Sequence, residues 1–307
     1  LFLGGIPMRV ISADIYDVDL SRDLRRSIWN PVILRLTTDE GIYGLGEVAL
    51  AYGTGKSGGL GMLKDMVEGF IIGTDPRRVD QIWHALFRQT FWGQGGGPVV
   101  YGAMSAIDES LLDIKGKALG VPVYELLGGK TRDNIRVYAN GWYSETTPKG
   151  RKLCILPEEY AEAALRAVAD GFNALKFDPF FISAHGVLRS PDPALSRESA
   201  NLAYERVAAV REAVGPNVDI LIEVHGNLGT TSAIQMGRRL AELDPFFYEE
   251  PVNAMNVESM LKVSQNVPIP IAAGERLYTR YGFREYIEKQ AIDILQPDVG
   301  LAGGISE

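Results

Sequence analysis

The sequence predicts an α/β protein with two domains: a small α+β domain over residues 1–129, and a domain of repeated strands and helices over residues 130–307. Two observations lead to this division. The first part reads as an antiparallel sheet followed by helices, and the second part alternates short apolar strands with helical stretches. Such repeats form a barrel of the TIM type or a doubly wound sheet. A dinucleotide-binding Rossmann fold is disfavoured, because no GxGxxG pattern follows the first strand.

Composition excludes several classes of partner. The 307 residues carry a formal net charge of -8 that is scattered along the chain, which disfavours nucleic acid and anionic membrane surfaces and favours a small molecule. The apolar opening, residues 1–7, is too short for a membrane span and lacks the basic flank of a signal peptide. A single cysteine, Cys154, cannot form an internal disulfide, so we expect a cytoplasmic protein.

The elements of the first domain follow from its apolar pattern. Residues 9–48 predict an antiparallel meander of three strands, with Gly41 supplying a positive φ in a hairpin turn. The glycine-rich residues 51–59 lack the spacing of a phosphate-binding P-loop and are interpreted as a lid or surface loop. Apolar residues three and four apart then predict helices over 62–127, the last of which ends at Gly120.

The second domain is predicted to contain six short apolar strands joined by helices. Each helical stretch is long enough to return across the back of a parallel sheet. The strands are expected at residues 135–140, 174–180, 219–226, 246–252, 269–277 and 293–299.

Acidic residues close three successive strands of this domain. Glu223, Glu249 and Glu275 are each 26 residues apart, so one carboxylate recurs at the same height on three βα units. In a barrel the carboxyl ends of the strands converge, and three anions at close range repel one another unless a cation neutralises them. Hard oxygen ligands with room for water and substrate suit Mg²⁺. The pattern therefore predicts a metal site.

An alternative is that each acid pairs with a nearby Lys or Arg in an ordinary salt bridge. This explanation suits a single strand-end acid better than three acids in phase. Glu250 has the opposite pleat parity to Glu249, so only one of the two faces the pore. Glu249 is assigned inward because it keeps the spacing.

These motifs together are similar to a known family. The stretches EVHGN, FYEEPV, AAGERLYTRYGFRE and DILQPDVGLAGGISE resemble the enolase superfamily, most closely the mandelate racemase-like branch of acid-sugar dehydratases, which includes galactonate dehydratase. The resemblance covers nearly the whole chain. It implies an N-terminal capping domain over residues 1–129 and a TIM-type barrel over residues 130–307.

The resemblance also implies roles for individual residues. Glu223, Glu249 and Glu275 would bind Mg²⁺ and hold a substrate carboxylate, which makes the α-proton acidic enough to remove. His225 lies on the same face as Glu223 and would be the general acid that protonates the departing β-hydroxyl. A structural histidine is the alternative for His225. Lys176 would line the site and balance the substrate carboxylate.

Two departures from the family pattern bear on the mechanism. Racemases of the family carry a KxK pair on the second strand, whereas this chain reads Lys176-Phe177-Asp178, which disfavours a lysine-driven racemase. Asp178 is expected to orient the substrate or to bond a sugar hydroxyl. Asp298 matches the residue that polarises a histidine base on the seventh strand. No seventh strand is visible in the sequence, so we expect the chain to be incomplete and its base to lie outside it.

Other residues have weaker assignments. Trp29, Tyr52 and Lys56 fall in two loops that the resemblance places over the barrel mouth, where they would select the far end of the substrate. Packing is the alternative for Trp29. Arg276, with Tyr278 and Arg280, would bond polyol hydroxyls or pair with neighbouring acids. His84 is expected in packing or at the surface, and His185 in a solvated loop.

The sequence as a whole therefore predicts a Mg²⁺-dependent dehydratase that converts a sugar acid to a 2-keto-3-deoxy acid. A cycloisomerase or an epimerase would share the first step and differ in the second. A barrel that keeps its metal-binding acids but acts as a non-catalytic scaffold is the alternative of another class. We expect a homo-oligomer, because symmetric assemblies are common for such barrels.

Overall fold

A computed structural model describes residues 8–20, 30–50, 54–147, 150–188 and 193–307. The chain divides into two compact units. The first unit takes in Leu1–Asp133, Leu277–Tyr281 and Pro297–Glu307, and the second takes in Asn134–Arg276 and Gly282–Gln296. The domain boundary expected between residues 129 and 130 stays a prediction. The compact units do not follow the order of the chain, since two segments from its C-terminal part belong to the first unit.

The sheet of the first unit is the predicted meander. Strands β1 (Val10–Asp17), β2 (Val32–Thr38) and β3 (Tyr43–Val48) pair antiparallel in that order. Side chains of β2 alternate between buried and half-buried, as expected for a sheet with one face on the core. Gly41 has φ 79° in the turn between β2 and β3.

Helices α1 to α4 complete the described part of this unit, and α3 packs unusually close to the sheet. A Cβ on Gly46 of β3 would lie 2.0 Å from the carbonyl oxygen of Ala106 in α3, so only glycine allows this approach of the two backbones. The helices are α1 (Lys56–Met66), α2 (Val79–Gln89), α3 (Gly97–Leu119) and α4 (Val123–Leu126), with a π-helical turn at Val67–Ile71.

The expected loop over residues 51–59 is wrong in part. Residues 51–53 lie outside the described residues, but α1 already begins at Lys56. Leu63 and Met66 of α1 are buried in the core of the unit. This packing outweighs the low helix propensity of the glycines at the start of the helix.

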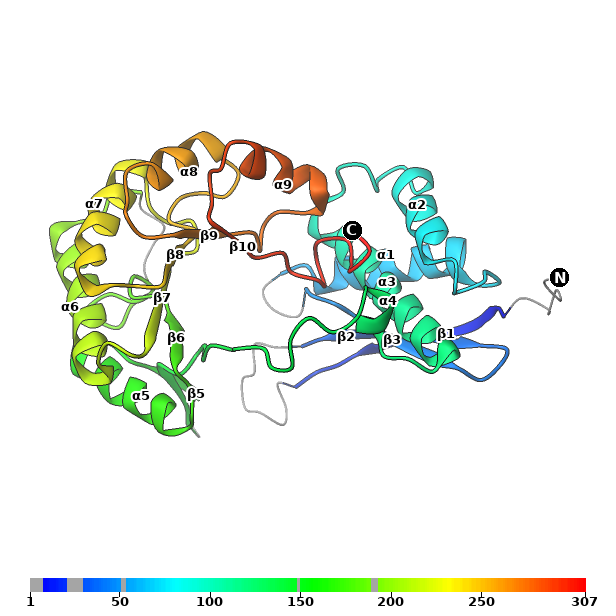
Figure 1. Cartoon of the computed structure of the whole chain (residues 1–307), viewed down its shortest axis with the longest axis horizontal. Coiled ribbons are helices and arrows are strands. Elements are labelled where there is room, and N and C mark those ends of the chain that lie inside the picture. Colours follow the sequence, from blue (N-terminus) through cyan, green and yellow to red (C-terminus); the bar gives the residue numbers. More distant parts are fainter. Residues whose placement is uncertain (1–7, 21–29, 51–53, 148–149, 189–192) are drawn as a thin grey trace. The chain divides into compact units, whose positions relative to one another are not determined.

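The second unit contains a parallel sheet whose strands follow sequence order. Strands β6 (Ala174–Phe177), β7 (Asp219–Glu223), β8 (Phe247–Glu249), β9 (Ile271–Ala273) and β10 (Ile294–Leu295) are neighbours in that order. Figure 1 shows the strands on a curve with the helices on its outer side, which is the arrangement of a barrel rather than of a doubly wound sheet. The helices are α5 (Pro157–Ala169), α6 (Arg197–Val214), α7 (Thr230–Leu240), α8 (Val257–Ser264) and α9 (Thr279–Glu288).

Two predictions for this unit need correction. The strand expected at 135–140 is reduced to one parallel bridge between Ala139 and Leu175, and Ile135 and Val137 are exposed. An antiparallel hairpin of β4 (Ser144–Thr147) and β5 (Gly150–Leu153) was not predicted, because its polar sequence shows no apolar alternation. No helix in the described ranges is long and apolar enough to cross a membrane.

Candidate active site

The candidate site lies at the carboxyl ends of β6, β7 and β8. Glu223 and Glu249 are register partners on neighbouring parallel strands, so the pleat directs both side chains to the same face. Lys176 on β6 reaches the same point. All three side chains are almost fully buried. Three ionisable groups in a buried position are costly unless they neutralise one another.

Lys176 lies between the two acids. Its Nζ is 2.8 Å from Glu223 Oε2 and 2.5 Å from Glu249 Oε2. Burial and the charge of Glu223 raise the pKa of Glu249 to about 8. For Glu223, burial acts to raise the pKa, but Lys176 and His225 outweigh it and lower the pKa. One ammonium therefore does not fully offset the negative charge that the two carboxylates create together.

This donor set suits a divalent cation. Two buried carboxylates in register are hard oxygen ligands, and their mutual repulsion would fall if a cation with two charges lay between them. Glu275, which follows β9, is near enough for its charge to raise the pKa of His225. It pairs with Arg276, however, and in the described part of the chain no three His, Cys, Asp or Glu side chains are arranged to hold a metal.

His225 is held on two sides. Its backbone has φ 55° in the turn that follows β7, and its N–H donates to Glu223 Oε1 over 2.9 Å. Its Nδ1 lies 2.8 Å from Asp178 Oδ2. Burial acts to lower the pKa of His225, but the hydrogen bond with Asp178 and the nearby carboxylates raise it to about 9. With Nδ1 at Asp178, Nε2 is the ring nitrogen left to donate a proton.

Asp178 serves this imidazole. The Asp178 carboxylate is 1% exposed, and its second oxygen accepts the N–H of Phe180 over 2.7 Å. Its expected contact with the substrate stays a prediction. Both carboxylate oxygens form hydrogen bonds within the protein, and the bond to Nδ1 orients the imidazole of His225.

Glu250, which is buried, pairs with the exposed Arg276. Glu250 is fully buried with φ 40°, and one of its oxygens accepts a hydrogen bond from Arg276 Nη1. Burial raises the pKa of Glu250 to about 7, although Arg276 opposes this. Arg276 also pairs with Glu275. Arg276 therefore pairs with neighbouring acids, which is the alternative considered for it above.

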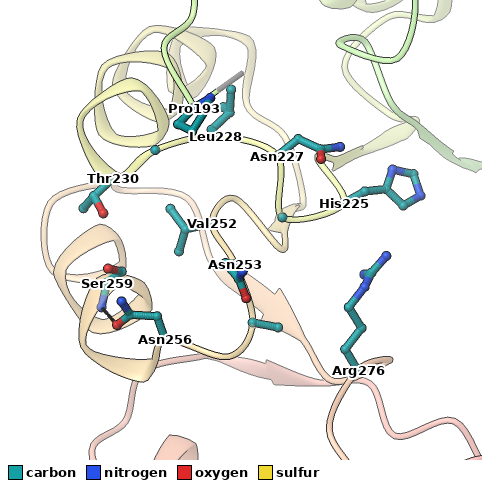
Figure 2. Close-up of a pocket in the computed structure, with 13 residues that line it drawn as sticks. Pro193, His225, Asn227, Leu228, Thr230, Val252, Asn253, Asn256, Ser259 and Arg276 are labelled. Atoms are coloured by element: carbon teal, nitrogen blue, oxygen red, sulfur yellow. Dashed lines mark hydrogen bonds between the residues drawn. The ribbon is translucent and has the colours of Figure 1, made fainter. Parts of the chain in front are cut away.

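A pocket of about 480 Å³ opens beside His225. Figure 2 shows His225 and Arg276 at one end of it, and Thr230, Asn256 and Ser259 at the other. Most of its polar lining consists of amides from the loops that follow β7 and β8 and of hydroxyls from the first turns of α7 and α8. Such groups can donate and accept hydrogen bonds with hydroxyl-rich ligands.

Comparisons with known proteins identify the family of this chain. Residues 25–128 match the mandelate racemase / muconate lactonizing enzyme N-terminal domain, and residues 159–307 match the enolase C-terminal domain-like family. A crystal structure of a member of the enolase superfamily from Salmonella Typhimurium superposes with a TM-score of 0.90 and 46% identity. That match covers 98% of this chain and 76% of the other.

The chain belongs to the enolase superfamily.

Its fold is therefore that of the superfamily, an N-terminal capping domain and a C-terminal TIM barrel, which confirms the predicted fold class. Among curated relatives, D-galactonate dehydratase of Xanthomonas oryzae pv. oryzae is 35% identical over 276 residues, which is 90% of this chain and 66% of that protein. D-gluconate dehydratase of Thermoproteus tenax is 38% identical over 235 residues, which is 76% of this chain and 44% of that protein. The chain thus spans less than two thirds of the length of these relatives.

The roles expected for four other residues stay predictions. Trp29 and Tyr52 lie outside the described residues. Lys56 donates to the Val18 carbonyl and pairs with Asp17 in the first unit. Asp298 also belongs to the first unit, so its role stays a prediction.

The other weakly assigned residues either contact neighbouring side chains or lie at the surface. Arg280 pairs with Glu307, and Tyr278 stacks on Tyr101. His84 and His185 are exposed, as expected.

Sequence reasoning missed two aromatic neighbours of Lys176. The ring of Tyr138 lies 5.6 Å from its ammonium, and Trp142 Nε1 donates to its backbone carbonyl over 2.9 Å. Tyr138 belongs to the first strand expected in the barrel, residues 135–140. The alternation of that strand, with Ile135 and Val137 on one face, gave no reason to select Tyr138 as a site residue. A search for aromatic residues near the lysine strand end would have found both.

Proposed function

We propose that this protein is a Mg²⁺-dependent acid-sugar dehydratase that acts on an aldonate or aldarate. The observation that carries the proposal is the position of His225, whose Nδ1 is hydrogen-bonded to Asp178 and which follows a strand that carries one of two buried carboxylates in register. Its curated relatives support the reaction class, since they are dehydratases of D-galactonate and D-gluconate.

Glu223 and Glu249 would hold the metal ion, and Glu275, which pairs with Arg276 in this structure, would turn to become its third ligand. When bound, Mg²⁺ supplies positive charge that offsets the charge developing on the substrate carboxylate. Lys176 is already within hydrogen-bonding distance of two of these acids, and its ammonium would add to the positive charge at the substrate carboxylate. The amide and hydroxyl lining of the neighbouring pocket suits the hydroxyls of a sugar acid.

His225 carries the second half of the reaction. Loss of the α-proton leaves an electron pair that forms the new double bond as the β C–O bond breaks. Nε2 of His225 donates its proton to the departing hydroxyl, which leaves as water, and the enol product tautomerises to the 2-keto-3-deoxy acid. Asp178 stabilises the imidazolium before this transfer. Asp298 would orient the base that removes the α-proton.

The test is a screen of aldonates and aldarates with added Mg²⁺ or with excess chelator, in which the keto acid product is measured. We expect keto acid with Mg²⁺ only. His225→Gln should lower kcat by about 100-fold or more, because the proton donor is lost. His84→Gln, an exposed histidine of α2, is the matched control and should retain activity.

Two other outcomes would replace the proposal. Exchange of the α-hydrogen in heavy water without keto acid would indicate an epimerase or a cycloisomerase. Neither exchange nor product with any acid sugar would indicate the non-catalytic scaffold.

A further inference from the structure

Helix α6 buries an arginine that has no carboxylate partner among the described residues. Arg206 is 1% exposed, and within that part of the chain its guanidinium donates to backbone carbonyls alone. Its Nη1 lies 2.7 Å from both Pro179 O and Ile182 O, and its Nε and Nη2 lie 2.9 and 2.6 Å from Ile155 O. Burial lowers the pKa of Arg206. An arginine is costly to bury, so a position that keeps one calls for an explanation.

The carbonyls it binds identify the segment that it holds. Pro179 and Ile182 belong to the loop that follows β6, and Pro179 directly follows Asp178. Within that loop the N–H of Phe180 donates to one oxygen of Asp178. The other oxygen of Asp178 is hydrogen-bonded to Nδ1 of His225. The guanidinium thus joins the loop to Ile155 and to the body of α6. Its planar fork fixes the direction of each hydrogen bond.

A second arginine of the same helix gives a natural comparison. Arg211 also donates to backbone carbonyls, and its partners in the described ranges are those of Gly215, Val218, Leu243 and Asp244. These carbonyls precede β7 and β8, at the amino ends of the strands. In barrels of this type the amino ends serve stability, and the carboxyl ends carry the chemistry.

We propose that Arg206 is a positioning residue for the acid step: it fixes the loop after β6, so that Asp178 holds the imidazole of His225 in its donating orientation. The inference rests on the proposed function for its kinetic consequence. Its structural consequence, the hydrogen bond between Asp178 and His225, can be measured without a substrate.

The kinetic test compares Arg206→Met and Arg206→Lys with Arg211→Met, at saturating Mg²⁺ and on the aldonate that the wild type converts. We expect kcat per folded molecule to fall by about 10-fold to 100-fold in Arg206→Met, with KM near the wild-type value, because orientation and not binding is lost. Arg206→Lys keeps the positive charge but lacks the planar fork of the guanidinium. Its kcat should lie between that of Arg206→Met and that of the wild type. Arg211→Met should lower the melting temperature and keep kcat.

The structural test uses protein labelled with ¹⁵N in its histidines, in the presence of chelator. The chain has three histidines, so the His225 signals can be assigned by comparison with His225→Gln. We expect to observe a low-field resonance of the Nδ1 proton of His225 in the wild type and in Arg211→Met. It should be lost or shifted in Arg206→Met and in Asp178→Asn.

The two tests separate the possible failures. If the wild type converts no acid sugar, the proposed function fails, and the proton resonance still decides on the role of Arg206. An unchanged resonance in Arg206→Met, or a kcat equal to that of Arg211→Met, would overturn the inference. If Arg206→Met does not fold, Arg206→Lys decides alone: wild-type kcat with an unchanged resonance would overturn it.

Discussion

Glu109 of α3 allows a quantitative prediction for the first unit. Its carboxylate accepts the N–H of Glu47 over 2.8 Å, and burial together with the charges of Asp108, Glu47 and Asp298 raises its pKa to about 7. The unfolded chain has the usual value near 4.5. Between these two values the folded state binds more protons than the unfolded state, so stability falls as the pH rises from 4.5 to 7.

The size of the effect follows from the shift. At about 1.36 kcal/mol per pKa unit, ionised Glu109 destabilises the fold by about 3 kcal/mol above pH 7, and by almost nothing below pH 4. Glu109→Gln keeps an oxygen acceptor for the Glu47 N–H and removes the charge. The variant should therefore match the wild type at pH 4 and exceed its free energy of unfolding by up to about 3 kcal/mol at pH 8.

Urea unfolding followed by circular dichroism at several pH values measures this difference. Glu68→Gln is the control, because Glu68 is an exposed acid on the same unit and its removal should change little at any pH. A constant difference between Glu109→Gln and the wild type from pH 4 to pH 8 would refute the reasoning, because it would mean that burial does not disfavour the ionised form.

Two further predictions concern packing and charge. Gly46→Ala should destabilise the protein by at least about 3 kcal/mol, because its Cβ would lie 2.0 Å from a helix carbonyl, whereas Gly61→Ala, on an open helix position, should stabilise it by about 0.5 to 1 kcal/mol. Thermal melting of both variants checks the pair, and equal effects would contradict the packing. Lys176→Met should cost about 3–5 kcal/mol in chelator, since it leaves two buried carboxylates without their ammonium, and Mg²⁺ should restore part of the loss. If neither the Lys176→Met substitution nor the addition of Mg²⁺ changes the melting temperature, the two carboxylates are not ionised at the same time.

The strand-end acids could be predicted from the sequence because they depend on periodicity alone. A spacing of 26 residues and a period of two along a strand were enough to select Glu223 and Glu249, and the structure places them as register partners. The choice of Glu249 over Glu250 followed from the same spacing, and Lys176 contacts the first of these, whereas Arg276 contacts the second.

The role of Asp178 could not be predicted in the same way. Its contact with His225 joins two strands, and it depends on the path of the loop after β6, for which the sequence carries no periodic signal. The carbonyls around Arg206 are equally hidden, because backbone acceptors are the same at every position of a sequence. The start of helix α1 was missed for another reason: its glycines suggest a loop, and its burial in the core outweighs their low helix propensity.

The two left-handed residues at neighbouring strand ends have a consequence for protein engineering. His225 and Glu250 both have positive φ, a conformation that glycine adopts without strain and that a long side chain such as Glu rarely adopts. A search for thermostable variants that scores backbone strain alone would therefore favour glycine at both positions. It would remove the proposed proton donor and the buried partner of Arg276 in the same step, and the more durable protein would be inactive.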